Sequence, residues 1–179
     1  MKKTALLCLL LVFCRQWAQT KLVTKTGKIT FEASVPAFEE VKATNEAVTC
    51  ILNPATGEIA SLALLKGFRF KVALMEEHFN ENYVESDKFP KATFKGKIDN
   101  FDVSKLTAAA KEYTIKGKLE LHGKTKDIVV IAKIKKTEAG VEIDAAFSVN
   151  TDDFDIEIPS VVSKKLSKKV AVTLDCTLK

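Results

Sequence analysis

Hydrophobic and polar residues alternate with a period of two along most of the chain. From Tyr113 to Leu121, every second residue is apolar or glycine, and the residues between them are threonine, lysine and glutamate. This period is typical of β-strands that bury one face. The strand that begins near Ile128 differs, because Val129 and Ile131 make its start apolar on both faces. Comparable alternation predicts further strands near residues 29–33, 48–52, 58–65, 92–98, 141–149 and 170–178.

One segment follows a helical period instead. Between Val72 and Tyr83, apolar and weakly polar residues recur at helical spacing, and glutamates and an asparagine occupy the other face. We therefore expect a short amphipathic helix, ended by the polar residues 86–88 and by Pro90. The inward face is predicted to carry Leu74, Met75, His78, Phe79, Asn82 and Tyr83.

About eight strands with one apolar face each must hide those faces, either in a sandwich or in a closed barrel. Short turns at Gly123-Lys124 and at Thr137 to Gly140 predict antiparallel neighbours. A barrel also removes the exposed edges of a long sheet. Charged outward faces exclude an outer-membrane barrel, whose outer band is apolar. We therefore predict a mainly β, single antiparallel, about eight-stranded lipocalin-like barrel with one short helix.

The first 18 residues have the composition of a secretory signal peptide. Lys2 and Lys3 precede an apolar stretch from Ala5 to Phe13, and Ala18 suits the position before cleavage. A lipoprotein anchor at Cys14 is the weaker alternative, because bulky Phe13 precedes it. We expect a signal peptide over residues 1–18, a barrel domain over residues 19–179, and a periplasmic or secreted protein.

The charge balance gives no support for nucleic-acid binding. The formal net charge is +5, and it falls to +2 without Lys2, Lys3 and Arg15, since the leader contains no acidic residue. Hydrophobic residues make up 46% and charged residues 28%, which is typical of a folded domain rather than a disordered chain.

Several motifs closely resemble those of the YceI family. They are Leu74 to Tyr83 followed by Lys88 to Phe94, Tyr113 to Leu119 with Leu121 to Lys126, Gly27 to Phe31, and Asp153 to Ile156. They cover nearly the whole chain after the leader. Asp155 departs from the pattern, because the family usually has glycine there, and the chain is also on the short side.

The resemblance implies a lipocalin-like barrel that is exported and holds a polyprenyl lipid or quinone tail inside. We accordingly predict an isoprenoid or quinone-type lipid as the bound partner, with no other cofactor and no catalysis. A hydrocarbon chain needs contact area rather than directional bonds. The predicted ligand pocket consists of Phe31, Phe70, Leu74, Met75, Phe79, Phe94, Tyr113, Leu119 and Phe147.

Other interpretations stay open at this level. The same apolar residues fit a barrel filled by its own side chains, which would act as a structural or protein-interaction module. Lys164, Lys165, Lys168 and Lys169 fit a solvated loop, or a rim that meets a diphosphate or transiently contacts an anionic membrane surface. The oligomeric state is also open, with a homodimer as one option.

The remaining candidate residues point to structure rather than chemistry. Cys50 and Cys176 share inward faces, so they form either a disulfide or two buried thiols. His78 has no second histidine at zinc-helix spacing, and we predict no metal site. His122 is expected to hydrogen-bond and fix its hairpin. No serine or cysteine lies in a nucleophile motif.

Overall fold

Alternating segments become nine strands in the structure, a computed structural model that describes residues 21–179. The predicted signal peptide lies outside the described residues. The strands are β1 (Leu22–Ser34), β2 (Lys42–Leu52), β3 (Glu58–Leu64), β4 (Arg69–Phe70), β5 (Lys91–Ile98), β6 (Lys111–Leu121), β7 (Lys124–Thr137), β8 (Gly140–Asn150) and β9 (Leu166–Leu178). The helical elements are α1 (Ala73–His78) and four short turns, η1 (Leu65–Gly67), η2 (Phe79–Tyr83), η3 (Val103–Lys105) and η4 (Thr151–Phe154).

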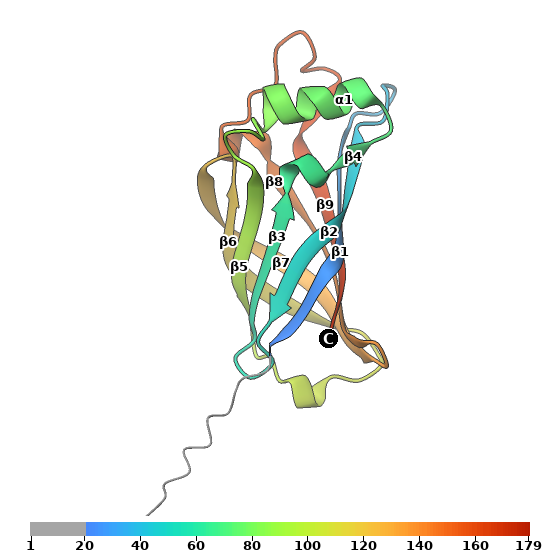
Figure 1. The fold of residues 1–179 in the computed structure, drawn as a ribbon, viewed down its shortest axis with the longest axis vertical. Coiled ribbons are helices and arrows are strands. Elements are labelled where there is room, and N and C mark those ends of the chain that lie inside the picture. The colour runs from blue at the N-terminus through green and yellow to red at the C-terminus, as the bar shows by residue number, and fades with distance from the viewer. Residues whose placement is uncertain (1–20) are drawn as a thin grey trace, which may run out of the picture.

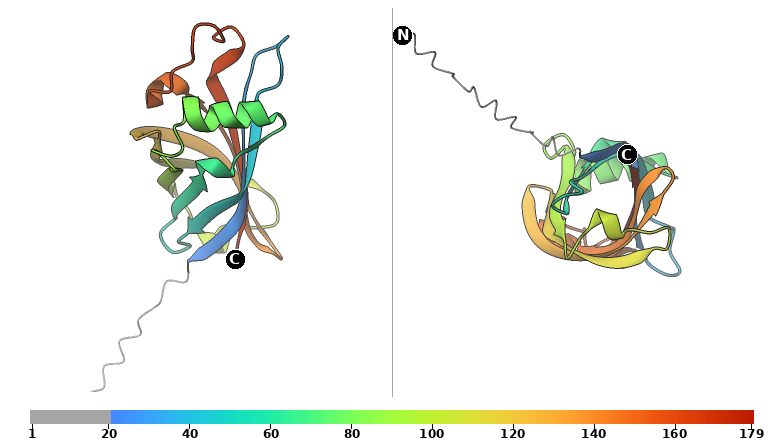
Figure 2. Two further views of the ribbon diagram at one scale, coloured as in Figure 1. Left: turned by 45° about the horizontal axis from the view of Figure 1, so that its top comes forward. Right: turned by 90° about the horizontal axis from the view of Figure 1, so that it is seen from below.

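Eight of these strands close into a barrel. The sheet order is β1-β9-β8-β7-β6-β5-β3-β2-β4, and an antiparallel pairing of β1 with β2 joins its ends. Seen from below, the strands form a ring (Figure 2). The two-residue β4 extends β2 at one end only. The predicted antiparallel, eight-stranded barrel with one short helix is confirmed.

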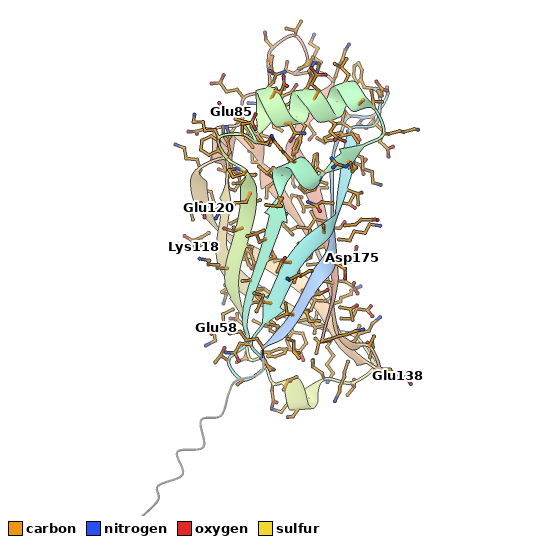
Figure 3. All side chains as sticks on the ribbon, viewed as in Figure 1. Glu58, Glu85, Lys118, Glu120, Glu138 and Asp175 are labelled. Carbon is orange, nitrogen blue, oxygen red and sulfur yellow. The ribbon has the colours of Figure 1, made fainter. Side chains whose placement is uncertain are left out.

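The period-two pattern separates the inside of the barrel from its outside. On β7, Val130, Ala132 and Ile134 are buried, and the residues between them are exposed. Lys118, Glu120 and Asp175 lie on the outer surface (Figure 3). This arrangement places apolar side chains in the lumen and charged ones in water, as the sequence predicts.

The two ends of the barrel are closed differently. At the end that carries the C-terminus, Leu52, Ile134 and Leu178 are fully buried, and η3 lies across the opening (Figure 1). At the opposite end α1 and η2 lie over the barrel mouth (Figure 1). Within residues 21–179, no helix has the length and apolar character needed to cross a membrane.

The helix predicted over residues 72–83 is divided into two parts. An α-helix runs from Ala73 to His78, and a π-helical turn follows from Phe79 to Tyr83. The wider turn changes the angular spacing, so a single helical period does not describe which residues face inward. The hairpin between β6 and β7 also turns one residue earlier than expected, at His122 and Gly123, both with positive φ.

Candidate functional site

The barrel contains an apolar cavity of about 260 Å³ that is partly open to the surface and is lined in part by residues of α1 and η2. An apolar cavity of about 150 Å³ already stays dry and binds benzene. The walls come from β1, β2, β3, β5, β6, β7, β8 and β9, and the roof comes from α1 and η2. Seven of the nine predicted pocket residues line the cavity: Phe31, Phe70, Met75, Phe79, Phe94, Leu119 and Phe147. Whether they contact a ligand stays a prediction.

Leu74 and Tyr113 do not line the cavity. Leu74 is 56% exposed, and the cap residues that line the cavity are Met75, His78, Phe79 and Tyr83. Tyr113 lies near the closed end and packs edge-on against Phe101, with ring centroids 6.0 Å apart. It faces inward, but below the cavity floor, since alternation predicts the face of a strand and not the depth along the barrel.

Four phenylalanine rings attach the cap to the barrel wall. Phe79 of η2 contacts Phe31, Phe68 and Phe70 with ring centroids 5.2, 5.8 and 5.3 Å apart. The three pairs are stacked, edge-on and tilted, respectively, and aromatic pairs at these separations contribute attraction beyond the area that they bury. Phe68 is 5% exposed and also lines the cavity, but it was not among the predicted pocket residues. Phe68 and Phe70 lie on one face of this segment, and exposed Arg69 between them lies on the other.

Polar contacts fix the start of the cap. The Arg69 guanidinium donates to the Glu76 carboxylate at 2.7 Å, and the backbone N–H of Phe70 donates to the same carboxylate at 3.2 Å. The Asn80 side-chain amide donates to the Glu76 carbonyl at 2.8 Å. Glu76 therefore ties α1 to β4, a role that its place on the polar helix face does not reveal.

The barrel wall is interrupted between β7 and β8. Their ladder runs from Thr137 and Gly140 to Ile131 and Ala146, where it ends. Above this point η4 packs against both strands, and its buried Phe154 lines the cavity. Val129 and Ile131, the outward apolar residues of β7, are exposed beside the interruption. The strand that is apolar on both faces thus lies where the sheet separates.

Ion pairs hold η4 against the β6–β7 hairpin. Lys124 Nζ lies 2.6 Å from Asp155 Oδ2, and Lys126 Nζ lies 3.8 Å from Asp153 Oδ1. The Lys124 ammonium, by hydrogen bond and charge, holds the pKa of the Asp155 carboxyl below its usual range. Asp155 has φ of 52°, a left-handed conformation that glycine adopts easily and that aspartate also tolerates.

His122 joins three parts of the same end of the barrel. Its Nδ1 lies 2.9 Å from the Phe154 carbonyl oxygen, and its Nε2 lies 2.9 Å from Glu85 Oε2. Phe89 packs edge-on against the imidazole at 4.6 Å. The predicted hydrogen-bonding role of His122 in fixing its hairpin is present, and it extends to η4 and to the end of the cap.

Cys50 and Cys176 are both buried, and both thiols are free. The Cys176 thiol donates to Cys50, and this hydrogen bond, together with burial, raises the pKa of Cys176. Gly27 lies between them, since a Cβ atom there would be 3.3 Å from both Cys50 Sγ and Cys176 Cβ. The two thiols therefore lie close together inside the barrel, and the disulfide stays a prediction.

The four lysines of the basic run are exposed; Lys164 and Lys165 precede β9, whereas Lys168 and Lys169 lie within it, because β9 begins at Leu166, earlier than the alternation predicts. Lys168 Nζ pairs with Asp152 Oδ2 at 2.9 Å, and none of the four lysines lines the cavity. In the described part of the chain, no group of three or more His, Cys, Asp or Glu residues is placed to hold a metal ion.

Comparisons with known proteins place the chain in a family. The model of the YceI-like domain matches residues 17–178. The fold is similar to a polyisoprenoid binding domain from Saccharophagus degradans implicated in plant cell wall breakdown, with a TM-score of 0.76, 15% identity, and coverage of 89% of this chain and 97% of that one. No curated protein matches the sequence.

Two further solved structures share the fold. Burkholderia cenocepacia BcnA has a TM-score of 0.68 and 15% identity, over 83% of this chain and 94% of that one. The Campylobacter jejuni YCEI protein has a TM-score of 0.60 and 16% identity, over 81% of this chain and 89% of that one. Because the family model matches residues 17–178, almost the entire length, this chain belongs to the YceI-like family.

Proposed function

We propose that this protein is an exported carrier that binds an isoprenoid or other lipid chain in its lumen and shields it from water. The observation that carries the proposal is the apolar cavity of about 260 Å³ beneath a helical cap. The similarity to a polyisoprenoid binding domain supports the choice of ligand class. The leader-like composition of residues 1–18 supports export.

Burial of hydrocarbon supplies the binding free energy. Each methylene removed from water contributes about 0.8 kcal/mol, and phenyl rings and Met75 provide contact area that adapts to a branched chain. Because α1 and η2 lie over the mouth (Figure 1), we expect the cap to move as the chain enters. The ring cluster around Phe79 is the contact that such a movement breaks.

Two rival functions fit this structure less well. A barrel filled by its own side chains would leave no cavity of this size in the lumen. A catalytic barrel would need ionisable groups held in the lumen, whereas no Asp, Glu, Lys or Arg of residues 21–179 lines the cavity, and its ionisable side chains are Cys50, His78 and Tyr83. Binding without chemistry is the function that a hydrocarbon lining serves best.

The test is to purify the protein from its own host and to extract it with organic solvent for mass spectrometry. The proposal predicts a stoichiometric isoprenoid or lipid that is absent from an extract of a cavity-filled variant, Ala145→Phe. Ala146→Phe is the matched control, because Ala145 lines the cavity and its neighbour is exposed. Repeated extracts of wild-type protein without any lipid would contradict the proposal.

A further inference from the structure

The residues that line the cavity limit which polar end group the ligand can carry. No Lys or Arg of the described residues 21–179 lines the cavity. A diphosphate binds where cations or clusters of N–H groups meet it, and burying an unpaired charge is costly. Lys164, Lys165, Lys168 and Lys169 are exposed outside the lining, and Lys168 is occupied by Asp152. The cavity therefore suits a ligand whose end group is uncharged.

Most polar side chains in the lining already make a hydrogen bond within the protein or are buried out of contact with the cavity. The Thr93 hydroxyl donates to Glu120 at 3.2 Å, and the Ser167 hydroxyl donates to the Lys169 carbonyl at 2.8 Å. Thr151 Oγ1 is buried without a partner and is out of reach of a ligand in the cavity. Among the described residues, the lining side chains that make no such bond and stay reachable include Ser61, His78 and Tyr83.

Tyr83 is the best placed of the three. It ends the π-helical turn of the cap, lines the cavity, and packs against the hydrophobic core. Burial raises the pKa of the Tyr83 phenol, which keeps the hydroxyl protonated as a donor. His78 is exposed, so water competes for its ring nitrogens. Ser61 lies on the wall of β3, away from the cap.

We propose that the Tyr83 hydroxyl hydrogen-bonds an uncharged oxygen at the end of the ligand, an alcohol or a carbonyl, while the isoprenoid tail extends into the hydrocarbon lumen. This inference rests on the proposed function. It assigns the cap a second role, because the element that closes the cavity also recognises the ligand's end group. It also separates an alcohol or quinone-type ligand from a polyprenyl diphosphate.

The test compares three probes that share isoprenoid structure but differ in their end group: geranylgeraniol, geranylgeranyl diphosphate and squalene. Each is titrated against wild type, Tyr83→Phe and Tyr113→Phe. Tyr83→Phe removes only the hydroxyl, and Tyr113→Phe is the control, since Tyr113 lies outside the cavity lining. We expect Tyr83→Phe to lower the affinity for geranylgeraniol about three- to tenfold, as for the loss of one neutral hydrogen bond, and to leave the affinity for squalene unchanged.

The outcomes distinguish this inference from the proposed function. Diphosphate binding tighter than the alcohol, or equal losses for the alcohol and squalene in Tyr83→Phe, overturns the role of Tyr83 and leaves the carrier function intact. No measurable binding of any probe, squalene included, overturns the carrier function and the inference with it. Weaker binding of the alcohol in Tyr113→Phe also contradicts the assignment.

Discussion

Two glycines face each other across β5 and β6 because a phenyl ring occupies the space beside them. Gly96 pairs with Gly117 in the ladder. A Cβ atom at Gly96 would lie 2.7 Å from the Phe94 ring, and one at Gly117 would lie 2.6 Å from the same ring. Phe94 lines the cavity, so the glycine pair is what lets this ring lie flat against the wall.

We expect Gly117→Ala to destabilise the barrel. Its Cβ atom would lie 2.5 Å from the Lys95 carbonyl oxygen and 2.6 Å from Gly96 Cα, and backbone cannot move aside as a side-chain tip can. Overpacking of this kind costs about 1–3 kcal/mol. Denaturant unfolding at unchanged m value measures the loss. Gly27→Ala is the milder comparison, because the closest contact of its Cβ atom would be 3.1 Å. Equal stability of Gly117→Ala and wild type would show that the barrel wall is not tightly packed at Gly117.

Which residues line the site could be predicted only in part from their spacing. Period-two alternation correctly assigned Phe31, Phe94, Leu119 and Phe147 to the lumen. It could not reveal that Tyr113 lies below the cavity floor, because depth depends on strand stagger and on where the closed end begins. Leu74 was misplaced because a six-residue helix offers too few turns to fix its inward face.

At the scale of elements, the cap is held mainly through one ring. Phe79 contacts three barrel phenylalanines, while Glu76 anchors only the start of α1. Removal of a large buried aromatic side chain costs about 3–5 kcal/mol, and Phe79 belongs at the low end because it is only partly buried.

We therefore predict that Phe79→Ala lowers the free energy of unfolding by about 3 kcal/mol and speeds the release of a bound apolar probe. Leu74→Ala on the same helix is the matched control, because Leu74 is 56% exposed and should change neither quantity. Stopped-flow release and denaturant unfolding provide the measurements. Equal release rates in wild type and Phe79→Ala would mean that the cap does not control entry.

The η4 segment makes the capped end of the barrel sensitive to acid. Lys124 holds the folded-state pKa of Asp155 below its usual range, so Asp155 contributes stability above its unfolded pKa. That contribution is lost as pH falls through the folded value, when the carboxyl is protonated. Both side chains are exposed, so the effect is small and is screened by salt.

The matching prediction is that Asp155→Asn melts at a lower temperature than wild type at pH 7. The difference should shrink as the pH falls below about 4, where wild-type Asp155 also loses its charge. Asparagine tolerates the left-handed backbone at this position, so the variant isolates the charge. Asp153→Asn should lower the melting temperature less, because the ion pair that Asp153 makes with Lys126 is longer. A constant difference at every pH would contradict this account.

At the scale of the molecule, the alternating pattern carried enough information to predict a closed barrel. Each strand offers one apolar face, and closure hides all of them and leaves no free edge. The gap between β7 and β8 could not be predicted from the sequence. Val129 and Ile131 give β7 an apolar outer face beside the gap, but such a face equally fits a strand that is buried on both sides. The cavity volume could not be predicted from the sequence either, because it depends on how the curvature of the sheet and the volumes of the inward side chains combine around the barrel.

The central claim is that the lumen itself holds the hydrocarbon chain. The most direct measurement is the affinity of geranylgeraniol for Ala145→Phe and Ala146→Phe, adjacent substitutions that point into and out of the barrel. A phenyl ring that displaces only two methylenes of ligand removes about 1.6 kcal/mol, which is more than tenfold in affinity. We predict that Ala145→Phe loses binding by at least about tenfold while Ala146→Phe binds as wild type does. Equal affinities of the two folded variants would place the ligand outside the lumen and contradict the claim.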